Sequence, residues 1–328
     1  MESHCISIIP ATDLDTYMNK HALPYLNGIS TTGYLAVPDH PESKGVYYEY
    51  YRAKDAKGAI VISHGFSESA EKYKEVIYYM VSSGYSVFII DQRGHGRSLR
   101  VSSHPNKIHV EHFGDYVSDL HLFVEKIVKP RTAGLPLYLF AHSMGGAIGA
   151  LYLETYPNDF QKAVLSSPML RINTSIFPET AALLIARSMV KQGKGEAYGL
   201  WQHDFIPGES FSDSASSCEE RFLYYSKKRE ATPHFQVSGS TYNWIYEAIR
   251  ADRSMRSKEG CSKIKIPILV FQCMKDSSVD ARGISEFVSH TPSAKLIQIT
   301  DCKHEIYNSC DSVLKKYYDQ LFRFLRDH

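Results

Sequence analysis

Short apolar runs alternate with amphipathic helical patterns along much of this chain. The continuous apolar runs at residues 59–65 and 85–91 are typical of strands in the middle of a parallel sheet, whereas residues 45–53 alternate like a strand with one exposed face. A helical pattern at residues 73–83 separates the two apolar runs. This order predicts parallel strands that are joined by crossover helices.

The same alternation continues toward the C-terminus. The pattern predicts further strands at residues 136–141, 163–166, 266–273 and 294–300, and helices at 112–128, near 145–154, at 282–289 and at 312–326. Between residues 171 and 262 it predicts only helical segments and a polar loop. An interruption of about 90 residues inside a sheet is far longer than an ordinary connection and is typical of a functional lid.

These patterns predict an α/β protein with a mostly parallel central sheet and helices on both faces. Residues 1–170 and 263–328 are expected to form the catalytic domain, and residues 171–262 a helical cap, or lid, inserted into it. A chain of 328 residues is long enough to bury a substantial core.

Charge and cysteine content narrow the functional classes. The net charge is +1 and no long basic run is present, so the electrostatic signature of nucleic-acid binding is missing. The six cysteines form no C-x-x-C pair and no zinc spacing, as expected for free thiols in a reducing cytosol. Because we find neither a secretory signal pattern nor an apolar run near the roughly 18 residues that span a bilayer, we expect a cytoplasmic location, with peripheral membrane contact as an option.

The segment AHSMGG at residues 141–146 predicts a nucleophile elbow. Ser143 lies where a strand must turn sharply into a helix, and such a strained turn exposes the hydroxyl. Gly145 and Gly146 leave room for the neighbouring strand and helix. The first N–H groups of the helix point to the same place and favour a developing negative charge.

With this elbow the chain resembles the α/β-hydrolase superfamily, in particular its lysophospholipase and monoacylglycerol lipase branch, although Ala141 replaces the first glycine of the usual G-x-S-x-G. SHGFSES at residues 63–69 resembles the family's H-G-x-G-E-like segment. The resemblance implies that the backbone N–H groups of Phe66 and Met144 form the oxyanion hole. It also implies that His64, Gly65 and His142 shape the site.

Two later motifs resemble the rest of a catalytic triad. LVFQCMKDSSVD at residues 269–280 is similar to the family's L-L-x-Q-G-x-x-D-x-x-x-D, which implies that Asp276 is the acid and leaves Asp280 to cap the next helix. DCKHEI at residues 301–306 matches the H-E-I tail of the lysophospholipase branch and implies that His304 is the base. Both residues follow predicted strands in the order that this fold requires.

The segment DQRGHGRS at residues 91–98 resembles the branch's D-x-R-G-H-G-x-S, which shapes the floor of the site. His95 is therefore expected to be structural. The triad requires neither a metal nor an organic cofactor.

The predicted helix at residues 179–193 carries an apolar face, made of Ala182, Ile185, Ala186, Met189 and Val190. This face can pack on the core, or it can form an acyl-chain wall or a lid that touches a membrane. Aromatic residues from 201 to 246 favour an apolar cap with polar tips. Such a cap suits a single acyl chain with a polar head.

The predicted function is a serine esterase or lipase that hydrolyses a lysophospholipid or a monoacylglycerol through an acyl-enzyme. One alternative is a carboxylesterase or thioesterase for short acyl groups. Another is an inactive α/β-hydrolase that only binds a lipid or a partner. We expect a small acyl-ester lipid as the partner, no nucleic acid, and transient contact of the lid with a membrane surface; the oligomeric state stays open.

Overall fold

The computed structural model describes residues 6–132 and 134–327. Its centre is an eight-stranded sheet with the strand order β1-β2-β4-β3-β6-β7-β9-β10. β2 pairs antiparallel with β1 and β4, and the other neighbours are parallel. The strands are β1 (Ser30–Leu35), β2 (Val46–Tyr51), β3 (Ala59–Ser63), β4 (Ser86–Ile90), β6 (Leu137–His142), β7 (Lys162–Ser166), β9 (Ile268–Cys273) and β10 (Ala294–Ile299). The predicted mostly parallel sheet is confirmed.

Helices cover both faces of this sheet, because successive side chains of each central strand point to opposite faces and both sets are apolar. On β3, Val61 packs in one cluster of buried side chains and Ile60 and Ile62 in the other. The first cluster includes α4 (Gly114–Phe123), α6 (Met144–Thr155) and α11 (Ala281–His290). The second includes α3 (Lys74–Ser82) and α12 (Asp311–Arg326).

β2 departs from its predicted half-exposed pattern. The structure buries five of its six residues, including Glu49. Glu49 accepts hydrogen bonds from the hydroxyls of Tyr47 and Tyr51, and Lys74 on α3 donates to it at 2.5 Å. The alternation was therefore misleading, because the polar positions of β2 are satisfied by tyrosine hydroxyls and by a lysine from another element.

Elements near the N-terminus were not predicted. They are α1 (Leu14–Tyr17), α2 (Leu23–Ile29) and the edge strand β1. β1 is only partly buried, so its sequence lacks a clean apolar alternation. In the described residues, 6–132 and 134–327, we find no helix that is both long and apolar enough to cross a membrane.

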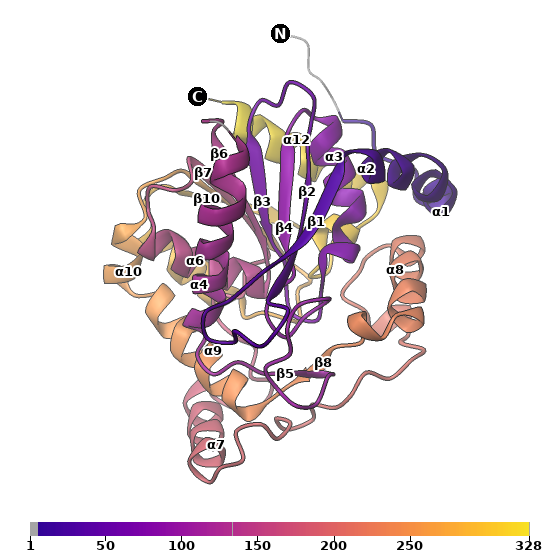
Figure 1. The fold of residues 1–328 in the computed structure, drawn as a ribbon. Coiled ribbons are helices and arrows are strands. Elements are labelled where there is room, and N and C mark those ends of the chain that lie inside the picture. The colour runs from indigo at the N-terminus through magenta and orange to yellow at the C-terminus, as the bar shows by residue number, and fades with distance from the viewer. Residues whose placement is uncertain (1–5, 133, 328) are drawn as a thin grey trace.

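The segment between β7 and β9 contains most of the elements that lie beyond one end of the sheet, at the bottom of Figure 1. It comprises α7 (Glu179–Lys191), α8 (Glu219–Ala231), the short strand β8 (Ser238–Ser240), α9 (Tyr242–Met255) and α10 (Lys258–Lys263). β8 pairs with β5 (Lys107–Ile108), and a further short helix, α5 (Lys129–Thr132), precedes β6. α9 and α10 pack against α6, and α7 packs against α9. The insertion is thus attached to the scaffold through these helices and also through α8, whose buried Arg221 pairs with Glu75 on α3 and with Asp311 on α12.

Candidate active site

Ser143 lies at the turn between β6 and α6 in a strained backbone conformation, with φ 52° and ψ −120°. A non-glycine residue at positive φ persists only where its surroundings hold it there. Here the Ser143 N–H donates to the carbonyl of Ser166 at 3.2 Å, and the Ser143 carbonyl accepts from Met169 at 2.8 Å and from Gly146 at 2.9 Å. With a further bond from the Ala147 N–H to the Ser143 carbonyl at 3.2 Å, four backbone hydrogen bonds fix the residue at the bend.

The two glycines that follow allow α6 to approach its neighbours closely. A Cβ at Gly145 would lie 2.1 Å from the carbonyl oxygen of Ser63 on β3, and one at Gly146 would lie 2.5 Å from Pro168 Cβ. Both distances are shorter than a carbon contact permits, so neither position tolerates a side chain without movement of the backbone. The first of them also sets how closely the start of α6 approaches the loop after β3.

Asp276 and His304 come together at the ends of adjacent strands, β9 and β10. Asp276 Oδ2 accepts a hydrogen bond from His304 Nδ1 at 2.7 Å. Asp276 Oδ1 accepts from the backbone N–H groups of Ser278 at 2.8 Å and Val279 at 3.2 Å. Since Nδ1 carries the proton toward the carboxylate, Nε2 is left with its lone pair available.

Asp276 is held in its charged form. Burial opposes ionisation, but the hydrogen bond and charge of His304, together with the two backbone N–H groups, outweigh it and hold the Asp276 pKa below its usual range. Asp280 has a different role, since its side chain accepts from Arg282 N at 3.0 Å and caps α11. Of the two acids in the motif, only Asp276 bonds to His304 in the described structure.

Ser143 and His304 line one cavity of about 310 Å³. The ring of His142, next to Ser143, lies 4.8 Å from the ring of His304, centroid to centroid. In the described part of the chain, no hydrogen bond joins the Ser143 hydroxyl to the His304 ring. Such bonds are often long in enzymes without substrate and shorten when one binds.

The two amides expected in the oxyanion hole are placed beside this cavity. Phe66 lines the cavity, and Met144 is the first residue of α6, where a helix leaves its N–H groups without internal acceptors. Within residues 6–132 and 134–327, neither amide donates to another protein group. Both therefore remain available to an oxyanion at Ser143.

Comparisons with known proteins agree with this geometry. A family model described as serine aminopeptidase, S33, matches residues 54–311. The chain belongs to this family of α/β-hydrolases. It is a serine ester hydrolase of the branch that includes lysophospholipases and monoacylglycerol lipases.

Two relatives and one solved structure show how far the similarity extends. The lysophospholipase L2 of Escherichia coli strain K12 is 31% identical over 246 residues, which cover 74% of this chain and 70% of the relative. A probable lysophospholipase L2 of Haemophilus influenzae is 29% identical over 266 residues, covering 81% and 83%. A soluble variant of the Saccharomyces cerevisiae monoglyceride lipase, solved with a substrate analog, matches with a TM-score of 0.70 at 19% identity over 90% of this chain and 94% of that chain. The structural match supports the fold.

Three buried histidines of this hydrolase lie near the site and form hydrogen bonds with backbone groups. His64 donates from Nδ1 to the Gly65 carbonyl at 2.8 Å and accepts at Nε2 from the Gln92 N–H at 2.9 Å, which fixes one neutral tautomer. His142 donates to the Ser166 carbonyl at 3.0 Å, and burial lowers its pKa to about 4. Burial likewise lowers the pKa of His95 to about 3. All three are neutral at physiological pH.

Glu68 lines the cavity at Ser143, although no role was predicted for it from the sequence. This buried carboxylate accepts from the Gly65 N–H at 2.7 Å, from the Tyr73 hydroxyl at 2.6 Å and from the Tyr307 hydroxyl. Lys72 Nζ lies 3.1 Å from it. Burial opposes its ionisation, but Lys72 and these donors outweigh the penalty and hold the Glu68 pKa well below its usual range.

Lys72 extends this network to the histidine loop, because its ammonium also lies 2.5 Å from the carboxylate of Glu305. Glu305 follows His304 directly, and Gly65 precedes Phe66. The network therefore joins the loop of Gly65 and Phe66 to the loop that carries His304. The only sequence signal for it was the presence of a carboxylate within each motif, three residues after Gly65 and one after His304.

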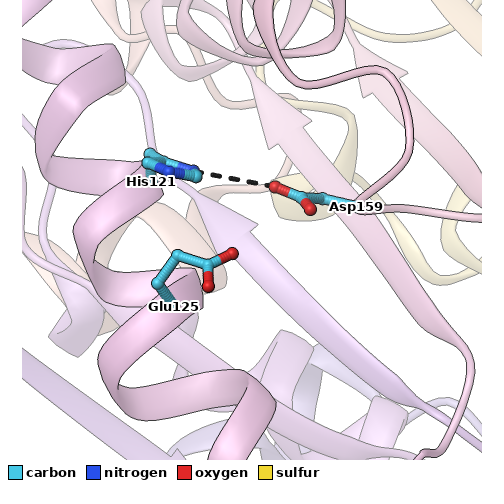
Figure 2. A group of neighbouring side chains, drawn as sticks. All are labelled: His121, Glu125 and Asp159. Carbon is cyan, nitrogen blue, oxygen red and sulfur yellow. Dashed lines mark ion pairs between the residues drawn. The ribbon is translucent and has the colours of Figure 1, made fainter.

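Figure 2 shows a group that resembles a metal site, made of His121, Glu125 and Asp159. His121 Nδ1 lies 3.7 Å from Asp159 Oδ2. However, the ammonium of Lys129 pairs with both carboxylates, at 2.7 Å from Asp159 and in a hydrogen bond to Glu125. The two negative charges are thus balanced by a lysine, and none of the four residues lines the cavity at Ser143. We assign no metal to this group.

Proposed function

We propose that this hydrolase cleaves the carboxylic ester of a lipid with a single acyl chain, a lysophospholipid or a monoacylglycerol. One observation carries the proposal. The cavity at Ser143 adjoins an apolar pocket of about 150 Å³, and the two share Ile172, Gln202 and Ser240. The apolar side chains of this second pocket are Phe177, Ala182, Ile185, Ala186, Leu200, Trp201, Tyr242 and Ile245. An acyl chain held there would place its ester carbonyl at Ser143.

The expected acyl face of α7 supports this proposal in part. Ala182, Ile185 and Ala186 line the apolar pocket. The same helix packs against α9. The apolar face of α7 therefore packs against α9 and also forms one wall of the pocket, because Tyr242 and Ile245 of α9 line the same pocket.

The proposed mechanism uses the groups in the positions described above. His304 Nε2 takes the proton of the Ser143 hydroxyl, and the oxygen attacks the ester carbonyl. Asp276 stabilises the resulting imidazolium, and the amides of Phe66 and Met144 donate to the oxyanion. His304 then protonates the leaving alcohol. Water activated by His304 next attacks the acyl-enzyme and releases the fatty acid.

We also propose transient contact of the inserted segment with a lipid surface. Ile176 is 78% exposed and Leu184 is 62% exposed, and each is next in sequence to a residue that lines the apolar pocket. Trp201, which lines the pocket itself, is 65% exposed. Exposed apolar side chains at the mouth of a lipid pocket favour contact with a lipid interface from which a single-chain substrate can enter.

A substrate panel tests the proposed function. Turnover is measured with lysophosphatidylcholine, with monoacylglycerols of graded chain length and with p-nitrophenyl butyrate. We expect the largest kcat/KM for a long-chain lipid, no turnover by Ser143→Ala, and nearly unchanged turnover by Ser278→Ala, which removes another hydroxyl of the same cavity. A wide preference for the butyrate ester would favour the short-acyl esterase instead. No turnover of any ester would favour an inactive binding protein.

A further inference from the structure

Two buried cysteines, which shortly precede Asp276 and His304 in the sequence, contact each other. Cys273 is the last residue of β9, and Cys302 lies in the loop after β10. Their Sγ atoms are 2.7 Å apart. The side chains are 2% and 1% exposed. Among the described cysteines, no other pair has its sulfur atoms in contact, since Cys218, Cys261 and Cys310 bond to oxygen atoms or to an arginine.

The backbone around this pair is already held in place. β9 and β10 are parallel neighbours, with Cys273 opposite Ile299, and the Met274 N–H donates to the Ile299 carbonyl at 2.9 Å. A disulfide bond is about 2.05 Å long, so the two sulfur atoms need to approach by less than about 1 Å. A shift of that size lies within the freedom of two χ1 angles.

We infer that Cys273 and Cys302 are a modification site at which an intramolecular disulfide forms under oxidising conditions. The bond would tie together the two loops that carry the acid and the base. Cys273 lies three residues before Asp276, and Cys302 lies two residues before His304. The cross-link would therefore hold the Asp276–His304 pair together, and it would involve no group that contacts the acyl chain.

The oxidation is balanced with a hydroperoxide as the oxidant. The thiolate of one cysteine attacks a peroxide oxygen, which gives a sulfenic acid and, with hydrogen peroxide, one water. The sulfur of the second cysteine then displaces the sulfenic hydroxyl as a second water, and the S–S bond forms. The peroxide has accepted the two electrons that the thiols lose.

The surroundings predict a slow reaction in both directions. Thr300 and Asp301 are exposed, so the peroxide reaches Cys302 through opening of this short loop. Burial raises the pKa of the Cys273 thiol, which keeps it protonated and slows its attack. The same property makes Cys273 a poor leaving group, so thiol exchange breaks the formed disulfide slowly.

Peptide mapping of the folded, full-length chain tests the inference. The wild type, Cys302→Ser and Cys310→Ser are incubated for hours with hydrogen peroxide, alkylated and digested. We expect a peptide that links Cys273 to Cys302 in the wild type and in Cys310→Ser, which removes an exposed thiol, but not in Cys302→Ser. The intact mass should fall by two hydrogen atoms. The wild type should then titrate four thiols instead of six.

Thermal unfolding gives a second measurement that does not depend on enzyme activity. The disulfide closes a loop between residues 29 positions apart and should raise the melting temperature by about 5 °C. Dithiothreitol should reverse this rise, and Cys302→Ser should show none. Should Cys302→Ser fail to fold, Cys302→Ala replaces it. Six thiols that remain free in the folded wild type, a link to another cysteine, or a link that forms only in urea would each overturn the inference.

Discussion

The ends of the central strands and the inserted segment differ in how their key side chains are held. Hydrogen bonds hold the backbone of Ser143 and the pair of Asp276 and His304 in place. The two glycines after Ser143 let the start of α6 pack closely against its neighbours. In the inserted segment, by contrast, Ile176 and Trp201 expose most of their apolar surface. The difference teaches that the proposed reacting groups lie on the rigid scaffold, whereas the insertion presents apolar side chains that can meet the proposed lipid. Rigid elements position reacting groups precisely, and less constrained segments adapt to a substrate.

The largest expected effect concerns the acid of the scaffold. Asp276→Asn should lower kcat on the order of 10⁴-fold, because an amide cannot hold the His304 tautomer or stabilise its positive charge. The matched variant Asp280→Asn should keep kcat within about 2-fold and change the stability by less than about 1 kcal/mol, because Asn caps a helix about as well as Asp does. Steady-state kinetics with urea unfolding measures both. Equal losses of kcat in the two variants would mean that Asp276 is not the acid that orients His304.

The second prediction concerns Asp252, a buried carboxyl within the inserted segment. This buried residue of α9 accepts from the Ile172 N–H at 2.6 Å, and Ile172 lines both the cavity and the apolar pocket. Burial raises the Asp252 pKa to about 7. A carboxyl group whose pKa is raised by folding stabilises the fold fully when the pH is below its pKa in the unfolded chain, which is about 4. This contribution to stability, up to about 4 kcal/mol, is lost as the pH rises through 7.

Asp252→Asn removes this titration. Relative to the wild type, the variant should therefore be more stable at pH 8 than at pH 5, as measured by urea unfolding. Asp301→Asn, at an exposed position, should show no such change between the two pH values. If the difference between Asp252→Asn and the wild type is the same at pH 5 and pH 8, the buried carboxyl does not titrate in this range.

The third prediction tests the apolar pocket. Ile185→Trp fills it, so kcat/KM for a long-chain monoacylglycerol should fall about 10-fold while that for p-nitrophenyl butyrate stays the same. Leu184→Trp adds the same bulk at the neighbouring exposed position and should leave both values unchanged. An equal loss for both esters in Ile185→Trp would mean that the pocket does not select chain length.

The smallest expected effect concerns the lipid surface. Ile176→Ser combined with Leu184→Ser should weaken binding to phosphatidylcholine vesicles several-fold, because the two apolar side chains, partly buried in the interface, together contribute about 1 kcal/mol. Sedimentation with vesicles measures this binding. Leu223→Ser, which removes an exposed leucine outside the apolar pocket, is the control. Unchanged vesicle binding by the double variant would exclude the proposed contact.

The sequence predicted the elements whose signal lies in a short stretch of residues, and it missed the contacts between residues far apart in the chain. The strands that carry the site are continuous apolar runs followed by a short motif, so their places were found to within about two residues. The pairing of β5 with β8 was not predictable, because it involves two and three residues about 130 positions apart. The burial of Glu49 and the network of Glu68, Lys72 and Glu305 depend on tertiary contacts that no periodicity reports. The attachment of α9 and α10 to α6 was missed for the same reason.

The covalent modification of Ser143 tests the central claim most directly. The folded chain is treated with a fluorophosphonate, and the labelled peptide is located by mass spectrometry. The account predicts one adduct per chain, on Ser143, no adduct in Ser143→Ala, and much slower labelling in His304→Ala, because the hydroxyl needs its base. An adduct on a different residue, or equal labelling of Ser143→Ala and the wild type, would contradict it.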